Sequence, residues 1–350
     1  MQKITVNASR VYDILIGRGL LTRMGSLIAA QVKGRSACLV SDSNVWPLHG
    51  AAAVKSLEEA GFSVRTFVFP AGEESKNAQT YLSLLSFLAQ RQLTREDCLV
   101  ALGGGVTGDL TGFAAATYLR GVPYVQVPTT LLAAVDSSVG GKTAIDLPEG
   151  KNLAGCFYQP SLVLCDIRAL KTLPTEVFLE GCAEVIKYGI LYDRPLFDYL
   201  KQEGMGFDRE QVIRRCVELK RNVVARDEFD TGARMQLNLG HTVGHAIEAL
   251  SGFTVSHGHA VAMGTAIVSR AAAKNGLLPQ EAAQAIEEAL GVFRLPTATT
   301  YPAEALTRHM LSDKKRAGDR VNLIVPRAIG RCEILPIPVE QLTDFVGSGL

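Results

Sequence analysis

The sequence predicts an α/β domain built on a parallel sheet, followed by a mainly α-helical domain, and three observations support this prediction. Apolar runs of strand length alternate with helix-length segments up to about residue 170, which is typical of parallel βαβ units. From about residue 175, long amphipathic or alanine-rich segments dominate. The chain has 350 residues, whereas single hydrophobic cores stop growing at roughly 250–300 residues. We therefore expect two domains, residues 1–174 and 175–350.

The elements of the first domain follow its hydrophobic runs. An expected hairpin, Lys3–Asn7 with Tyr12–Ile16, opens the chain. Helices are expected where apolar residues recur at helical spacing, at Ala51–Ala60, Ala78–Arg91 and Val106–Tyr118. The short apolar runs are expected strands, because strands buried on both faces of a parallel sheet are continuously apolar: Ser36–Val40, Val64–Phe69, Cys98–Leu102, Tyr124–Val127 and Leu162–Cys165.

The second domain is expected to be mostly helical. We place the boundary near Lys171–Pro174, and the chain has no internal repeat, low-complexity tract or flexible linker. The strand signal returns only at Arg320–Val325 and Cys332–Leu335. The expected helices are Thr175–Gly189, Arg209–Asp227, Thr242–Leu250, His259–Asn275 and Pro279–Leu290.

Composition excludes several classes of protein. With 36 Lys+Arg against 35 Asp+Glu, the formal charge is +1, which argues against a general nucleic-acid binder. A hydrophobic content of 47% excludes disorder. The N-terminus lacks the pattern of a signal peptide, and no apolar run approaches the length of a membrane span. Seven scattered cysteines without a C-x-x-C pair indicate a reduced, cytoplasmic protein without disulfides.

A glycine turn follows the expected strand Cys98–Leu102. Gly103, Gly105 and Gly108 match G-x-G-x-x-G, where glycines and a helix N-terminus accommodate a pyrophosphate in Rossmann-like domains. The fingerprint also expects an acid after the next strand, but the best acid is Asp42, after an earlier strand. The phosphate turn would then lie deeper in the sheet than usual. A tight strand-to-helix turn without a ligand stays open as an alternative, as does a helix-dipole role for Asp109.

A second glycine turn ends in Gly-Gly-Lys-Thr at residues 140–143. This ending is similar to that of a P-loop, but Asp136 stands where G-x-x-x-x-G-K-T requires its first glycine. A nucleotide-hydrolysing P-loop is therefore rejected. Lys142 stays a candidate anion binder, supported by Lys151 and Asn152, against the alternative that both lysines are solvated surface charges.

Histidines are concentrated in one region, since four of the six fall within 19 residues: His241, His245, His257 and His259. On a helix, His241 and His245 would share a face at i, i+4 spacing, which is one way to hold a divalent metal. Glu184 is the best candidate for a further ligand, because it lies in an otherwise apolar helical stretch with Lys187 at i+3. The alternatives are packed or capping histidines and a surface ion pair.

Nine stretches of the chain, each too short to suffice alone, together have a recognisable pattern. They are Pro70–Lys76, GGGVTGD (103–109), Arg120–Pro123, Gln126–Ala133, DSSVGGKTAID (136–146), Lys151–Asn152, AEVIKYG (183–189), NLGHTVGHAIE (238–248) and HGHAVAMG (257–264). In these stretches the sequence resembles the 3-dehydroquinate synthase family along nearly its whole length.

The resemblance implies a fold and a reaction. It implies an N-terminal NAD-binding α/β domain, a helical metal-binding domain, an active site between them, and a homodimer. The expected substrate is 3-deoxy-D-arabino-heptulosonate 7-phosphate, a small phosphorylated keto acid. Tightly bound NAD+ oxidises its C5 alcohol, phosphate leaves, NADH restores the alcohol, and ring opening with aldol closure gives 3-dehydroquinate for the shikimate pathway. The net reaction is not a redox one.

The resemblance also implies residue roles. Glu184, His241 and His257 would hold Zn2+ or Co2+, and His245 becomes a substrate contact. Phosphate would meet Lys142, Asn152, His245 and the Lys314–Lys315 loop, together with Arg120 of the partner subunit. The substrate carboxylate would meet Lys220, Arg234 and Asn238, while Lys187 and Asp136 complete the hydroxyl network. NAD would use Asp42, Asn44, Glu73, Lys76, Gly104, Gly105, Asp109, Thr129, Thr130, Lys142, Lys151 and Thr172.

Three alternative functions compete with this interpretation, and one residue differs from the family pattern. A sedoheptulose 7-phosphate cyclase would not need the carboxylate set Lys220, Arg234 and Asn238. An NAD- and metal-dependent polyol dehydrogenase would not need the phosphate set. A binding or regulatory protein would be expected to lose metal ligands or lysines, and none is lost. The departure is Asp230, where the family has a glutamate before Gly-x-Arg, which puts the fine geometry there in doubt.

Overall fold

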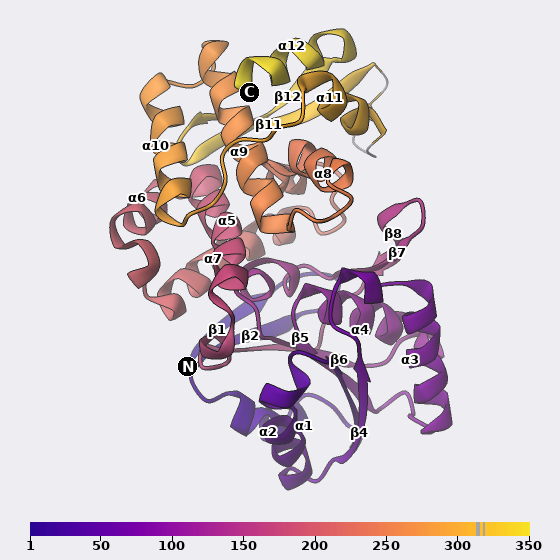
Figure 1. The fold of residues 1–350 in the computed structure, drawn as a ribbon. Coiled ribbons are helices and arrows are strands. Elements are labelled where there is room, and N and C mark those ends of the chain that lie inside the picture. The colour runs from indigo at the N-terminus through magenta and orange to yellow at the C-terminus, as the bar shows by residue number, and fades with distance from the viewer. Residues whose placement is uncertain (313–315, 318) are drawn as a thin grey trace. The chain divides into compact units, whose positions relative to one another are not determined.

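The computed structural model describes residues 1–312, 316–317 and 319–350. Their contacts divide the chain into two compact units (Figure 1). Unit 1 comprises Met1–Pro174 with Arg209–Phe229, and unit 2 comprises Thr175–Asp208 with Asp230–Leu350. Because Arg209–Phe229 returns to unit 1, the units are not two consecutive halves of the sequence.

Unit 1 is built on a seven-stranded sheet with the order β1-β2-β9-β6-β5-β3-β4. The β1–β2 hairpin is antiparallel at one edge, and the remaining pairs are parallel. The α/β prediction is thereby confirmed. The strands are β1 Gln2–Val6, β2 Tyr12–Gly17, β3 Ser36–Asp42, β4 Ser63–Phe69, β5 Cys98–Gly103, β6 Tyr124–Pro128 and β9 Leu162–Asp166.

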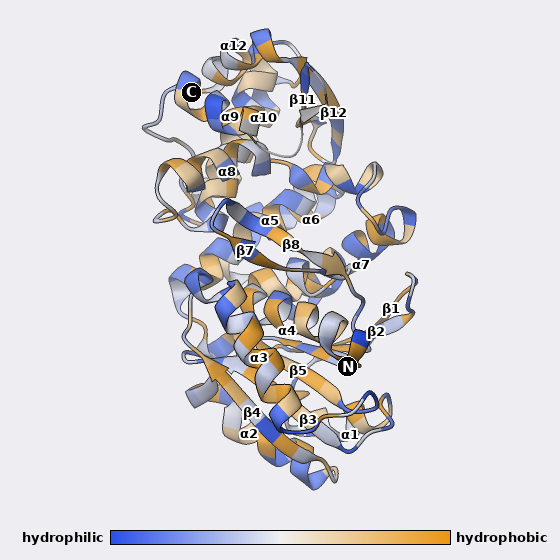
Figure 2. Cartoon of the chain, turned by 90° about the vertical axis from the view of Figure 1, so that its right-hand side faces the viewer, coloured by the Kyte–Doolittle hydropathy of each residue, from blue (hydrophilic) through white to orange (hydrophobic). Residues whose placement is uncertain are grey.

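Helices cover both faces of this sheet. Val100 and Leu102 of β5 pack into one hydrophobic cluster with α1 (Met24–Ala29) and α2 (Trp46–Glu59). Leu99, which points the opposite way, packs into a second cluster with α3 (Ala78–Gln90) and α4 (Gly105–Thr117). Successive residues of a strand point to opposite faces, so both faces of β5 are buried. This explains the hydrophobic colour of β5 in Figure 2.

The strand order creates a switch point between β3 and β5. From β3 the chain moves to its neighbour β4 on one side, and from β5 it moves to β6 on the other side. In open α/β sheets, ligands bind outside the carboxyl ends of the strands at such a point. The same unit also contains the helix α7 (Arg209–Arg226) and a hairpin of β7 (Lys142–Leu147) with β8 (Gly150–Phe157).

Unit 2 is mainly helical, and α9 is its central helix. Most of α9 is buried, and it packs against α5, α8, α10 and α12. A small antiparallel sheet of three strands, β10 to β12, completes the unit. The elements are α5 Thr175–Tyr192, α6 Arg194–Glu203, α8 His241–Leu250, α9 His257–Lys274, α10 Gln280–Val292, α11 Ala303–Ser312, β10 Arg316–Ala317, β11 Arg320–Ala328, β12 Arg331–Pro338 and α12 Val339–Gly349.

Glycines allow α9 to approach its neighbours closely. A Cβ atom on Gly258 would lie 2.4 Å from the carbonyl oxygen of Glu180, and one on Gly264 would lie 2.1 Å from that of Gly240. Side chains do not fit at these distances, so the first turn of α9 lies against α5 and its middle lies against the start of α8. No helix among the described residues is long and apolar enough to cross a membrane.

Candidate functional site

Three side chains of unit 2 direct electron-pair donors toward one point. Glu184 lies in the middle of α5, and His241 and His257 are the first residues of α8 and α9. Their ligand atoms all lie within 4.8 Å of one another. Nε2 of His241 is 3.4 Å and Nε2 of His257 is 3.6 Å from Oε1 of Glu184. One carboxylate and two imidazoles form a donor set suited to Zn2+ or Co2+.

Glu184 is fully buried, and Lys187 balances its charge. The side chain of Lys187 is 2% exposed and forms an ion pair with Oε2 of Glu184. A buried carboxylate is costly without such a partner. The alternative of a surface ion pair is therefore wrong. The two oxygens of Glu184 face different partners, with Lys187 on one side and the histidines on the other.

The proton affinity of His257 is strongly perturbed by its neighbours. Burial lowers its pKa, but the hydrogen bonds and charges of Glu184 and Glu248 outweigh burial and raise the pKa to about 10. Without a metal, His257 therefore carries a proton at neutral pH. A cation bound here would replace that proton.

The spacing argument for the histidines is only partly correct. His241 and His245 do lie on one helix, with ring centroids 5.7 Å apart. However, among the described residues His245 shares a group of possible ligands with Glu248 and His257, whereas His241 shares one with Glu184 and His257. The i, i+4 pair on α8 is thus not the pair whose nitrogens meet.

In unit 1 the glycine turn forms a cradle at the switch point. Gly103 ends β5, Gly104 precedes the helix, and α4 begins at Gly105. A Cβ atom on Gly104 would lie 3.1 Å from Cγ2 of Thr130, so a side chain would crowd the turn. The first NH groups of α4 and its dipole favour a phosphate.

Asp42 lies beside this cradle, as the sequence argument expects. Ser41 pairs with Leu102 in the β3–β5 register, which brings Asp42 next to Gly103. Oδ1 of Asp42 accepts hydrogen bonds from the NH groups of Asn44 and Val45 at 2.9 and 3.0 Å. Thr107 Oγ1 donates to its Oδ2 at 3.2 Å. An acid held at this place can accept from a ribose hydroxyl.

A charged cluster of unit 1 surrounds Lys76. Its Nζ lies 2.7 Å from Oδ2 of Asp109 and 3.5 Å from Oε1 of Glu73, and it donates to Oδ1 of Asn152. Burial lowers the pKa of Lys76, but these carboxylates outweigh it and raise the pKa. Burial raises the pKa of Asp109, against the opposing effect of Lys76. Within this cluster, one ammonium is therefore surrounded by oxygen acceptors.

Asp136 and Lys220 form another charged contact of unit 1. Asp136 lies in a π-helical turn, Ala133–Ser137, and such turns are frequent at functional sites. Nζ of Lys220, on α7, lies 2.9 Å from Oδ1 and 2.6 Å from the carbonyl oxygen of Asp136. The return of α7 to unit 1 therefore brings together a predicted carboxylate-binding residue and a predicted hydroxyl-binding residue.

Comparison with known proteins identifies the family. Residues 66–180 match the model described as 3-dehydroquinate synthase N-terminal, and residues 181–316 match the one described as C-terminal. The chain is 45% identical to 3-dehydroquinate synthase of Pelobacter propionicus over 357 residues, which cover 99% of each chain. It is 42% identical to that of Streptococcus suis (strain 05ZYH33) over 352 residues, which cover 98% of this chain and 99% of the relative. The chain belongs to the 3-dehydroquinate synthase family.

A solved structure agrees with this membership in the family at the level of the fold. The crystal structure of 2-deoxy-scyllo-inosose synthase complexed with carbaglucose-6-phosphate, NAD+ and Co2+ matches with a TM-score of 0.90 at 25% identity, and the match covers all of both chains. This chain therefore shares its fold with 2-deoxy-scyllo-inosose synthase.

The other residues that the 3-dehydroquinate synthase pattern selects are spread over both units. Arg234 is 2% exposed in the turn before α8, where Asn238 donates to the carbonyl of Met235 at 3.0 Å. Lys142 pairs across the β7–β8 hairpin with Phe157, so it does not lie opposite Asn152. The remaining residues of the predicted phosphate and NAD sets are Arg120, exposed after α4; Thr129, buried after β6; Lys151, on β8; and Thr172, exposed in the turn Ala169–Thr172. Lys314 and Lys315 lie outside the described residues.

Two residues near these sites were not predicted from the sequence. Glu248, 2% exposed on α8, contacts His257. His49, on α2, has Nε2 2.9 Å from Oγ1 of Thr172. The available signals were weak: a single acid in an otherwise apolar helix face, and a histidine in a helix far from Thr172 in sequence.

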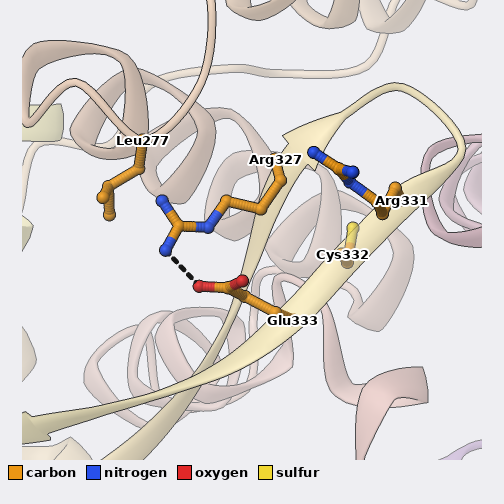
Figure 3. A pocket seen from close by; sticks show the side chains of 5 residues that line it. All are labelled: Leu277, Arg327, Arg331, Cys332 and Glu333. Atoms are coloured by element: carbon orange, nitrogen blue, oxygen red, sulfur yellow. Dashed lines mark ion pairs between the residues drawn. The ribbon is translucent and has the colours of Figure 1, made fainter.

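A pocket elsewhere in unit 2 has different chemistry. It is lined by Leu277, Arg327, Arg331, Cys332 and Glu333 (Figure 3). Arg327 and Glu333 form an ion pair across it, and none of its lining residues belongs to the predicted site. The charge of Arg327 is thereby balanced within the protein, and we do not assign a reaction to this pocket.

Proposed function

We propose that this chain converts 3-deoxy-D-arabino-heptulosonate 7-phosphate to 3-dehydroquinate and phosphate, the reaction of its family. The observation that carries the proposal is the convergence of Glu184, His241 and His257 in a chain 42–45% identical to curated 3-dehydroquinate synthases over nearly its full length. The reaction requires a site that removes a hydride, expels phosphate and then returns the hydride.

Both cofactors have residues that suit them. Bound NAD+ would supply reversible hydride transfer at C5, and bound Zn2+ or Co2+ would supply Lewis acidity toward the substrate hydroxyls. The glycine cradle and Asp42 suit the pyrophosphate and a ribose, and the carboxylate–imidazole set suits the metal. The related 2-deoxy-scyllo-inosose synthase structure contains NAD+ and Co2+. The proposed NAD residues are Asp42, Asn44, Glu73, Lys76, Gly104, Gly105, Asp109, Thr129, Thr130, Lys142, Lys151 and Thr172.

The chain's own residues bind and orient the substrate. Lys187, buried against Glu184, donates hydrogen bonds from Nζ to a substrate oxygen, and Asp136 accepts from a hydroxyl. Lys220, Arg234 and Asn238 hold the carboxylate and so select a keto acid over a neutral sugar phosphate. Charge that develops on the departing phosphate is stabilised by hydrogen-bond donors: Lys142, Asn152, His245 and Lys314, with Arg120 of the partner subunit. The role of that arginine makes the proposed enzyme a homodimer, and we place it in the cytoplasm.

The test combines three readouts in one reaction. Purified protein is incubated with NAD+, zinc and the heptulosonate phosphate, and we expect equal amounts of phosphate and dehydroquinate without net NADH. Steady accumulation of NADH would instead indicate a polyol dehydrogenase. Turnover of sedoheptulose 7-phosphate alone would indicate another cyclase. Arg234→Met should raise KM for the keto acid strongly, whereas Arg327→Met, a matched change at the pocket of Figure 3, should leave KM unchanged.

A further inference from the structure

We infer that Glu248 is a positioning residue that orients the imidazole of His257 toward the metal. The inference rests on the metal site proposed above and adds a residue to its surroundings. Oε2 of Glu248 lies 3.4 Å from Nδ1 of His257. On the other side of the same ring, Nε2 lies 3.6 Å from Oε1 of Glu184. The imidazole is therefore held between two carboxylates.

The two histidines of the centre are supported at the same ring atom by different acceptors. Nδ1 of His241 lies 3.0 Å from the carbonyl oxygen of Leu239, whereas Nδ1 of His257 faces Glu248. A neutral imidazole has one NH and one lone pair. An acceptor at Nδ1 keeps the proton there and leaves the lone pair of Nε2 for a metal.

The side chains of His241 and His257 differ in exposure as well as in the acceptor that Nδ1 faces. The side chain of His241 is 12% exposed, whereas that of His257 is 35% exposed at the first residue of α9. Packing thus restrains His241 more than His257. The carboxylate of Glu248, with a side chain only 3% exposed on α8, supplies a fixed anchor, and its charge also makes the imidazole a more basic ligand.

Glu248 could alternatively ligate a metal itself, because His245, Glu248 and His257 also present possible ligand atoms within 4.8 Å. The chemistry of His257 disfavours this. A metal between Glu248 and His257 would need the lone pair of Nδ1, which places the proton on Nε2, opposite Glu184. One neutral imidazole cannot give a lone pair to both sites, and Nε2 is the atom that faces Glu184.

The test measures cobalt binding and cobalt absorption spectra, which do not depend on turnover. Glu248→Gln keeps a neutral acceptor for Nδ1, and Glu248→Ala removes it. We expect both variants to retain a single cobalt site per chain, with affinity reduced about 10- to 100-fold and more in the alanine variant, and with a shifted visible absorption band. Glu287→Gln is the matched control, because it removes a carboxylate charge paired with Arg270 in the same unit; its cobalt affinity should equal that of the wild type.

Each contrary outcome has a distinct meaning. Unchanged cobalt affinity and spectrum in folded Glu248→Gln would overturn the positioning role and leave the metal site intact. Two cobalt ions in the wild type, with one lost in Glu248→Gln, would overturn it in favour of a metal ligand. Undiminished cobalt binding by His257→Ala would refute the proposed metal site itself. Should Glu248→Ala fail to fold, the glutamine variant alone decides, since it preserves the side-chain volume.

Discussion

The clusters around Lys76 in unit 1 and around Glu184 in unit 2 are both buried and both charged, but their chemistry differs. Lys76 is a central ammonium surrounded by oxygen acceptors. Glu184 is a central carboxylate that contacts one ammonium and faces two imidazoles. The first cluster already contains its cation. The second has ring nitrogens that can exchange a proton for a metal, so burial of charge alone does not identify a metal site.

The contrast between the two clusters would fail most clearly if the cluster around Glu184 did not hold the metal. His257→Ala should reduce bound zinc from one ion per chain to a small fraction and reduce turnover by at least about a hundredfold, beyond the effect typical of outer-shell changes. Metal content measured by mass spectrometry on folded protein, alongside the rate, checks this. A full complement of zinc in this variant would remove His257 from the ligand set.

The cluster around Lys76 should contribute to the free energy of unfolding but not to metal binding. Lys76→Met leaves Asp109 without its buried cation, and breaking such a pair costs about 3–5 kcal/mol. Urea unfolding should show that loss in the free energy of unfolding, while zinc content stays at one ion per chain. The double change with Asp109→Asn should recover part of the stability. Loss of zinc from well-folded Lys76→Met would contradict the separation of the two clusters.

Removal of the metal should destabilise the fold, and only through the cluster around Glu184. A ligand that binds only the folded chain contributes about 2.7 kcal/mol at a hundredfold excess over Kd. Removing zinc with a chelator should therefore lower the melting temperature, and adding zinc back should restore it. Glu184→Gln should show no zinc-dependent shift; a shift equal to that of the wild type would place the metal elsewhere.

Proton competition at His257 gives the smallest expected effect. The folded-state pKa is raised from 6.5 to about 10, so the proton stabilises the metal-free fold fully below the ordinary pKa, and this contribution is lost as pH rises through about 10. Binding a metal must release that proton. Cobalt affinity should thus increase by up to about tenfold per pH unit above neutrality. Affinity that does not change with pH would show that His257 binds no proton in the metal-free protein.

Much of the fold could be predicted, because its signals are local. Strands β5, β6 and β9 are buried at every residue, and continuous apolar runs identify such strands. The β7–β8 hairpin was missed, since lysine, aspartate and glycine interrupt Lys142–Phe157 and are unfavourable in strands. Helix α9 begins at His257, two residues before the predicted start at His259. Its N-cap is Ser256, a residue type favoured at that position, which helical spacing alone does not take into account.

The candidate site could be predicted only in part for the opposite reason. Helical spacing relates His241 to His245, but the meeting of His257 with Glu184 depends on the close packing of α9 against α5 and α8 at Gly258 and Gly264. Contacts of that kind are not local in sequence. The sequence pattern alone selects Glu184 and His241 as candidate ligands, the resemblance to a family adds His257, and Glu248 emerged only from the side-chain geometry.

Diffraction at the zinc absorption edge, from crystals grown with zinc, tests the central claim most directly. We predict one anomalous peak per chain, about 2.0–2.2 Å from a carboxylate oxygen of Glu184 and from Nε2 of both His241 and His257. A peak between His245 and Glu248, a peak beside the Lys76 cluster, or no peak at the Glu184 centre would contradict it.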